Sequence, residues 1–133
     1  GNQIYSPRFL ELWPNKVLNR HTSLLPSYGG IYPIFWQMLH GSNLGGVTLH
    51  WINKDIDRGT NAYQKEFKLE AGKTLFDYYK KAFEISLELC NQAIKDLENG
   101  IVKVEKSDLS PSYYSWPKPK DIDDFNKKGL KIL

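Results

Sequence analysis

The stretch from Thr74 to Gly100 restricts the possible folds of this chain more than any other part of its sequence. Its apolar residues recur every three or four positions, which places them along one face of a long α-helix. Thr74 followed by Asp77 resembles a capping box, and glycine is a residue at which helices commonly end. The predicted buried face comprises Leu75, Tyr79, Ala82, Phe83, Ser86, Cys90, Ala93, Ile94 and Leu97.

Shorter elements precede this helix. Residues 46–53 alternate two sets of side chains in the period of two that is typical of a strand, and residues 60–69 form a second probable strand. A third short strand, at residues 16–20, lies between two predicted helices that begin at Ser6–Pro7 and at Pro33. Strands and helices in this order predict an α/β fold in which helices flank a mixed sheet.

The composition of the 133 residues, 41% of them apolar, is that of one ordinary globular domain. No apolar run approaches the roughly 18–20 residues that span a bilayer, so we expect no membrane partner. The single cysteine, Cys90, cannot form an internal disulfide, which fits a reducing compartment and a cytoplasmic location. The net charge of +3 is mild, and the lysine-rich C-terminal tail is either solvated or attracts a phosphate-bearing substrate.

Asn19 and His21 are the candidate reacting residues. Side chains two apart in a strand project from the same face, so these two would stand together where the strand gives way to a loop. An amide donor beside a titratable imidazole suits a reaction that builds negative charge on a carbonyl oxygen and moves a proton. Taken alone, the pair is also typical of turn-capping or surface side chains, and Asp57 of a turn-forming residue in a hairpin loop.

Other site chemistries fit the sequence less well. Ser23 lies close to His21, but the Gly-x-Ser-x-Gly pattern that exposes a nucleophilic serine does not occur. The histidines and Cys90 share no metal-ligand spacing, so no metal site is predicted. His50 is expected on the polar side of its strand, His40 in the last turn of its helix, and Cys90 in the core.

Three segments together resemble one enzyme family. They are LNRHTSLLPSY at residues 18–28, GGVTLH at residues 45–50, and Asp57-Arg58-Gly59 followed by Gln64. The pattern resembles that of the 10-formyltetrahydrofolate-dependent formyltransferases, which include methionyl-tRNA, glycinamide ribonucleotide and amino-sugar N-formyltransferases. Their shared pattern is Asn-x-His-x-Ser-x-Leu-Pro, followed by a loop Asp before x-Gly. Thr22 occupies the variable position after the histidine, where many members carry Pro or Gly instead.

The resemblance implies a role for each member of a catalytic triplet. Asn19 would donate a hydrogen bond to the formyl oxygen of 10-formyltetrahydrofolate. His21 would help to stabilise the oxyanion and take up the proton that the attacking amine loses. Asp57 would hold His21 and favour its charged form, as a nearby carboxylate does.

The resemblance also implies where the donor binds. The pterin ring of 10-formyltetrahydrofolate would meet the backbone around Gln3, Ile4 and Tyr5. A second contact would come from Lys54 and Asp55, in the loop that leads to Asp57. These cofactor-binding residues follow from the family alone.

Family members begin with a nucleotide-binding-like βαβ portion that this sequence lacks. The resemblance therefore implies that residues 1–106 are the C-terminal part of a Rossmann-like formyltransferase catalytic domain, with the N-terminal part missing. Residues 107–133 would be a C-terminal loop and a short helix, at 121–128, that pack on it.

The acceptor expected from the resemblance is a primary amine on a small phosphorylated molecule, with a nucleotide-linked amino sugar preferred. A methionyl-tRNA acceptor is the alternative, although a net charge of +3 suits a small molecule better than tRNA. Two further alternatives are a formyltetrahydrofolate hydrolase that delivers the formyl group to water and a non-catalytic binding module. The oligomeric state does not follow from the sequence.

Overall fold

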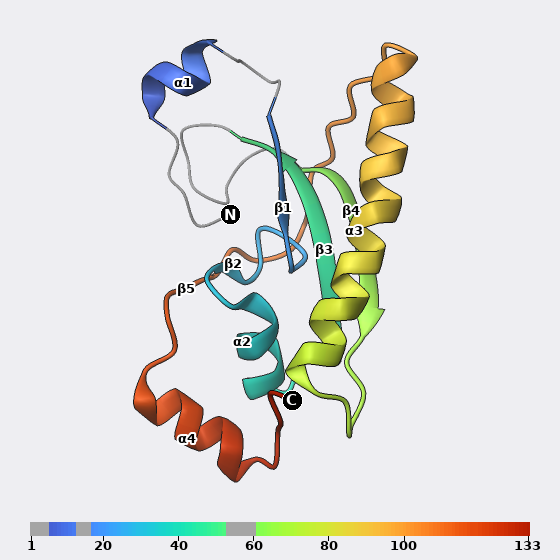
Figure 1. The fold of residues 1–133 in the computed structure, drawn as a ribbon. Helices are drawn as coiled ribbons and strands as arrows, with labels where there is room; N and C mark the ends of the chain where they lie inside the picture. Colours follow the sequence, from blue (N-terminus) through green and yellow to red (C-terminus); the bar gives the residue numbers. More distant parts are fainter. Residues whose placement is uncertain (1–5, 13–16, 53–60) are drawn as a thin grey trace.

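A computed structural model describes residues 6–12, 17–52 and 61–133 (Figure 1). Its elements are α1 (Pro7–Leu12), β1 (Leu18–His21), β2 (Gly29–Gly30), α2 (Pro33–Leu39), β3 (Leu44–Trp51), β4 (Asn61–Lys68), α3 (Leu75–Glu98), β5 (Tyr113–Tyr114) and α4 (Pro119–Lys127). A three-stranded sheet with the order β1-β3-β4 lies at the centre, and β2 pairs with β5 in a separate sheet. The predicted α/β architecture is confirmed.

The strands of the central sheet are all antiparallel to their neighbours. β1 pairs with β3 from Leu18↔Trp51 to His21↔Thr48, and β3 pairs with β4 over most of its length. The small sheet differs, because β2 and β5 run parallel. Antiparallel and parallel pairs therefore both occur, in two separate sheets.

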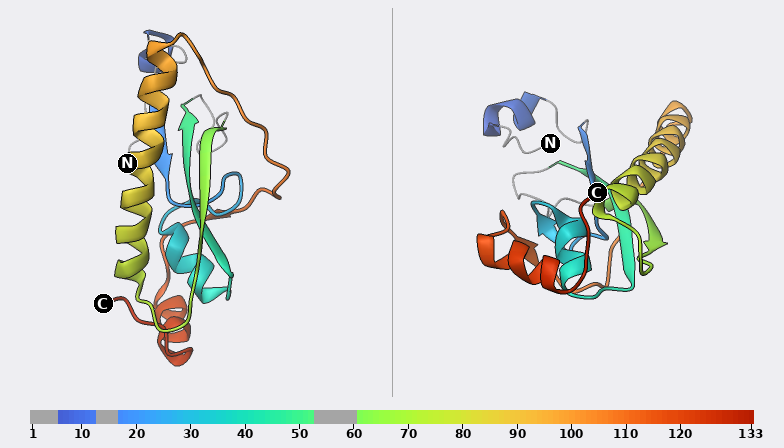
Figure 2. Two further views of the ribbon diagram at one scale, coloured as in Figure 1. Left: turned by 90° about the vertical axis from the view of Figure 1, so that its right-hand side faces the viewer. Right: turned by 60° about the horizontal axis from the view of Figure 1, so that its bottom comes forward.

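The capping box predicted at the start of α3 is confirmed. The backbone N–H of Asp77 donates to Thr74 Oγ1 (3.1 Å), and the backbone N–H of Thr74 donates to Asp77 Oδ2 (3.1 Å). The helix ends at Glu98, and Gly100 follows with a φ of +73°. It runs beside β3 and β4 and packs on both strands (Figure 2).

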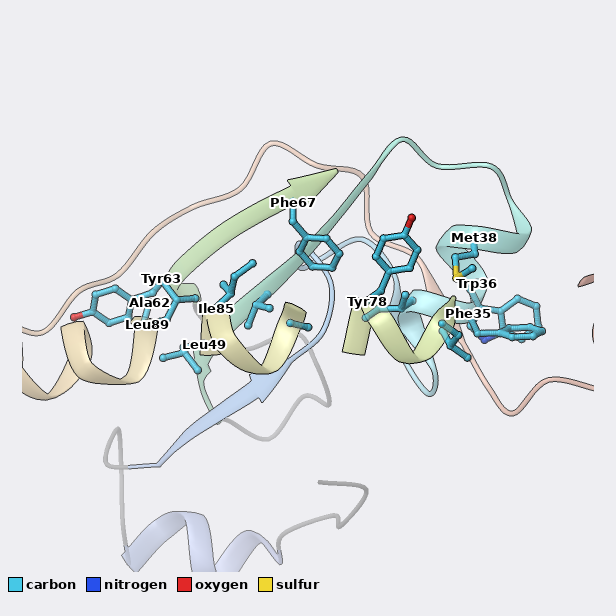
Figure 3. Packing of buried hydrophobic residues seen from close by; sticks show 14 of the residues in the cluster. Phe35, Trp36, Met38, Leu49, Ala62, Tyr63, Phe67, Tyr78, Ile85 and Leu89 are labelled. Carbon is cyan, nitrogen blue, oxygen red and sulfur yellow. The ribbon is translucent and has the colours of Figure 1, made fainter. Parts of the chain in front are cut away.

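The predicted buried face of α3 is partly wrong. Figure 3 shows Tyr78, Ile85 and Leu89 among the buried side chains, and these three were not predicted. Cys90, assigned to the core, is exposed. The helix carries two apolar stripes along its length. They are offset by only about one residue around the helix axis, so the sequence pattern did not separate them. The second stripe, which we call the outer stripe of α3, is exposed and consists of Phe76, Phe83, Leu87 and Ile94.

His50 lies with Thr48 on the polar face of β3, as expected, but this face is buried. Every residue from Gly45 to Trp51 is buried, and His50 is only 3% exposed. The reason is that both faces of the strand are covered. α3 packs on one face, and the loop that follows β1 lies against the other, where Leu25 N–H donates to Thr48 Oγ1 (3.0 Å).

The C-terminal residues pack on α2. α4 begins two residues before the predicted position, with Pro119 in its first turn. Phe125 of α4 is completely buried, and its ring stacks on Phe35 of α2 with centroids 4.7 Å apart. Within the ranges that the structure describes, no helix combines the length and apolar character needed to cross a membrane.

Candidate active site

β1 presents Asn19 and His21 on one face of the central sheet. The register places Asn19 opposite His50 and His21 opposite Thr48, so these four side chains share that face. Arg20, between them, points to the other face, where its Nη1 donates to Ser86 Oγ of α3 (3.4 Å). The candidate pair therefore lies on the side of β1 that α3 leaves uncovered.

The amide of Asn19 is held by a histidine. Asn19 Nδ2 lies 3.3 Å from His50 Nε2. An amide nitrogen only donates, so His50 accepts through Nε2 in this bond. This bond orients the Asn19 amide. His50 was not predicted as a site residue, because its position opposite Asn19 depends on the register of the two strands.

His21 is also fixed in one orientation. Its Nε2 lies 2.9 Å from the carbonyl oxygen of Tyr28, and the side chain is buried. A carbonyl oxygen only accepts, so Nε2 carries a proton in this bond. This bond fixes the orientation of the imidazole ring and the position of its Nε2 proton. Tyr28 has a left-handed backbone (φ +55°), which is part of the turn that presents its carbonyl to the ring.

A buried polar network holds the loop after His21. Thr48 Oγ1 donates to the Ser23 carbonyl (2.6 Å) and accepts from the backbone N–H of Leu25 (3.0 Å). Gln64 Nε2 donates to the Leu25 carbonyl (2.7 Å) and to Thr48 Oγ1 (2.9 Å). Asn61 Nδ2 donates to the same carbonyl (2.9 Å). Side chains of β3 and β4 thus bond the backbone groups of this loop, which in a strand would be bonded by the backbone of a neighbouring strand.

Close packing adds to this network. A Cβ atom at Gly46 would lie 2.4 Å from Leu24 Cδ2, so the loop approaches β3 as closely as it does only because this position is glycine. Ser23 is fully buried, and its hydroxyl donates to the Ser27 carbonyl (2.7 Å). Its hydroxyl therefore contributes to the structure of the loop.

We expect Thr48→Val to lower the free energy of unfolding by about 1–3 kcal/mol, because it leaves buried partners of the hydroxyl without a hydrogen bond. Thr48→Ser keeps the hydroxyl and is the matched control. Urea denaturation of both variants measures the difference. Equal stability of the two variants would show that the hydroxyl does not hold the loop.

Stacked aromatic rings support the turn that carries the Tyr28 carbonyl. The ring of Tyr28 stacks on Tyr114 (centroids 5.3 Å apart), and Tyr114 stacks on Trp36 (5.1 Å). Gly30 allows this contact, because a Cβ there would lie 2.0 Å from the Tyr114 carbonyl oxygen. The pairing of β2 with β5 therefore holds the Tyr28 carbonyl, which binds His21, in place. The segment that contributes β5 lies over eighty residues later in the sequence.

The other predicted site residues lie outside the described part of the chain. They are Gln3, Ile4, Tyr5, Lys54, Asp55 and Asp57. Among the residues that are described, no three or more His, Cys, Asp or Glu side chains form a group that could hold a metal ion.

Comparison with known proteins identifies the family. The family model described as "Formyl transferase" matches residues 2–94. The chain is 30% identical to methionyl-tRNA formyltransferase of Borreliella burgdorferi over 98% of its own length and 42% of the relative's. It is 35% identical to the bifunctional polymyxin resistance protein ArnA of Wigglesworthia glossinidia brevipalpis, over 98% and 20% of the two chains.

Solved structures agree with the sequence comparison. The formyltransferase PseJ from Anoxybacillus kamchatkensis, in complex with UDP-4,6-dideoxy-4-formamido-L-AltNAc and tetrahydrofolate, matches with a TM-score of 0.77 and 25% identity. That match covers 94% of this chain and 64% of PseJ, so the chain spans only part of each of these relatives. Because a family model covers well over half of the residues and the fold agrees, the chain belongs to the formyl transferase family.

Proposed function

We propose that the protein carrying this chain transfers a formyl group from 10-formyltetrahydrofolate to a primary amine, with Asn19, His21 and Asp57 at the reacting centre. The observation that carries the proposal is the placement of Asn19 and His21 on one face of β1, each oriented by its own hydrogen bond. An oriented amide donor beside an imidazole suits acyl transfer, in which an oxyanion forms and a proton moves.

In the proposed reaction, the lone pair of the amine attacks the formyl carbon and the carbonyl electrons move onto its oxygen. Asn19 Nδ2 has two hydrogens, so it can donate one to His50 and the other to this oxygen. The carbonyl then re-forms and expels N10 of tetrahydrofolate. The amine nitrogen loses one proton and N10 gains one, and His21 carries that proton between them. Asp57 favours the charged imidazole that exists between the two transfers.

The proposed donor is supported by a relative. PseJ, with a TM-score of 0.77, is described in complex with tetrahydrofolate. For this chain we assign the pterin contacts to the backbone of Gln3, Ile4 and Tyr5 and to Lys54 and Asp55. All five belong to the stretch that the family model matches.

A nucleotide-linked amino sugar is the acceptor that we favour. PseJ is described in complex with a formylated UDP-sugar, which is the kind of product that such a reaction would give. Methionyl-tRNA is the second candidate, because relatives at 30% identity are methionyl-tRNA formyltransferases. The two differ in size and charge, so one assay separates them.

The assay follows formation of tetrahydrofolate from 10-formyltetrahydrofolate by the protein that carries this chain. The amines are nucleotide-linked amino sugars, glycinamide ribonucleotide and methionyl-tRNA, with a reaction that contains no amine as the control. We expect the fastest release with an amino sugar, and a product heavier by one formyl group in place of hydrogen. Release at the same rate without an amine would assign a hydrolase instead, and no release with any amine would refute the proposed function.

A further inference from the structure

Two exposed aromatic side chains touch one another beside the candidate site. Tyr32 and Trp116 are 42% and 57% exposed, and their ring centroids lie 5.1 Å apart in an edge-to-face contact. Each ring therefore leaves much of its surface to solvent. An exposed aromatic pair of this kind is a typical element of a binding surface.

The backbone holds this pair in place. Tyr32 has a left-handed conformation (φ +53°), which is costly for a residue other than glycine and is retained only where the surroundings enforce it. Trp36 Nε1 donates to the carbonyls of Ile31 (3.1 Å) and Ser115 (3.2 Å), the residues directly before Tyr32 and Trp116. One buried indole thus fixes both segments, and the two exposed rings are organised before any ligand binds.

Tyr32 lies near the residue that follows His21. Burial raises the pKa of Tyr79, on α3, to about 12; its bond to the Thr22 side chain opposes that shift, and the nearby phenol of Tyr32 adds to it. Tyr79 thus interacts electrostatically with Tyr32 and is bonded to Thr22, the residue next to His21. From the other direction, the Tyr28 carbonyl that binds His21 lies four residues before Tyr32.

The position along β1 separates this pair from the proposed donor site. β3 ends at Trp51, opposite Leu18, and β4 begins at Asn61, opposite His50. Trp51 and Asn61, which flank the segment to which we assign Lys54 and Asp55 as pterin contacts, therefore lie near the start of β1. Thr22, near the Tyr32 side of the site, follows the end of that strand. Asn19 and His21 lie between Leu18 and Thr22, at these two ends of β1.

We propose that Tyr32 and Trp116 form an aromatic wall of the acceptor site, on which a flat ring of a nucleotide-linked amino sugar stacks. This inference rests on the proposed function and adds to it the surface that selects the acceptor. Aromatic faces bind the flat face of a nucleobase and the C–H face of a sugar ring alike. Lys118 and Lys120, both exposed, lie two and four residues after Trp116 and supply positive charge suited to the phosphates that join these two rings.

The test measures kcat and KM for the best amino sugar and for 10-formyltetrahydrofolate in Trp116→Ala and Tyr32→Gly. Glycine is chosen at position 32 because it removes the ring and adopts a φ of +53° without strain. Trp116→Phe keeps an aromatic face, and Leu109→Ala removes a side chain of similar exposure (43%) from the same C-terminal segment. We expect the acceptor KM to rise about tenfold in the first two variants, with kcat and the donor KM within about twofold of the unmodified protein.

Binding of the nucleotide-linked sugar and of the corresponding nucleoside diphosphate, measured by calorimetry, identifies the stacked ring. If Trp116→Ala weakens both ligands, the base stacks on the wall; if it weakens only the sugar nucleotide, the sugar ring does. An unchanged acceptor KM in both ring-deletion variants, or a rise in the donor KM instead, overturns the inference. That result does not contradict the proposed function. Failure of the unmodified protein to formylate any amine would refute the proposed function, and the calorimetry would still test whether Tyr32 and Trp116 bind the nucleotide-linked sugar.

Discussion

Replacing His21 by alanine is expected to lower kcat for formyl transfer by about 10²–10⁴-fold, with a much smaller change in the donor KM. The reason is that the amine must lose a proton while tetrahydrofolate gains one, and the variant has no group at that place to carry it. The measurement is the rate of tetrahydrofolate formation with the best amine at saturating concentrations of both substrates.

The matched control for this variant is His40→Gln. His40 is an exposed histidine at the end of α2, where it contacts aromatic rings and no proposed reacting atom. Its replacement is expected to leave kcat within about twofold. A kcat of His21→Ala close to that of the unmodified protein would remove His21 from the reaction, and Asn19 would then lose its proposed neighbour in catalysis.

Gly30→Ala is expected to lower the free energy of unfolding by roughly 3–5 kcal/mol, the largest stability effect that we predict. Two costs add at this position. The backbone has a φ of +96°, and the new Cβ would lie 2.0 Å from the carbonyl oxygen of Tyr114, which is backbone and cannot rotate away. Urea denaturation measures the change.

Gly72→Ala separates these two costs. Gly72 has a similar φ of +83°, but a Cβ there would meet no atom within 4 Å. We expect about 1–2 kcal/mol from conformational strain alone in this variant. If Gly30→Ala lowers the free energy of unfolding no more than Gly72→Ala does, the backbones of β2 and β5 can move apart at little cost in free energy. Their contact would then not be the rigid support of the Tyr28 carbonyl described above.

Local sequence patterns predicted those features that depend on a few neighbouring residues. The capping box of α3 requires only Thr74 and Asp77, three positions apart, and it formed as predicted. Alternation along β1 likewise placed Asn19 and His21 on one face. In both cases the geometry of one helix turn or one strand decides the outcome, so no distant contact could change it.

Features that depend on distant contacts did not follow from the sequence. Which of two apolar stripes of α3 faces the sheet is decided by packing against β3 and β4, and this placed Cys90 outside the core. Burial of Thr48 and His50 depends on the loop that covers their face of the sheet. The support of His21 through Tyr28 depends on Tyr114, and no local pattern connects those two tyrosines.

The exposed position of Cys90 has a practical consequence. It is the only cysteine among the 133 residues, so a maleimide dye or nitroxide added to this chain attaches at a single point. That point is on α3, which packs on the opposite face of the sheet from Asn19 and His21. A fluorophore there would report ligand-induced changes by energy transfer without occupying the space in which substrates meet.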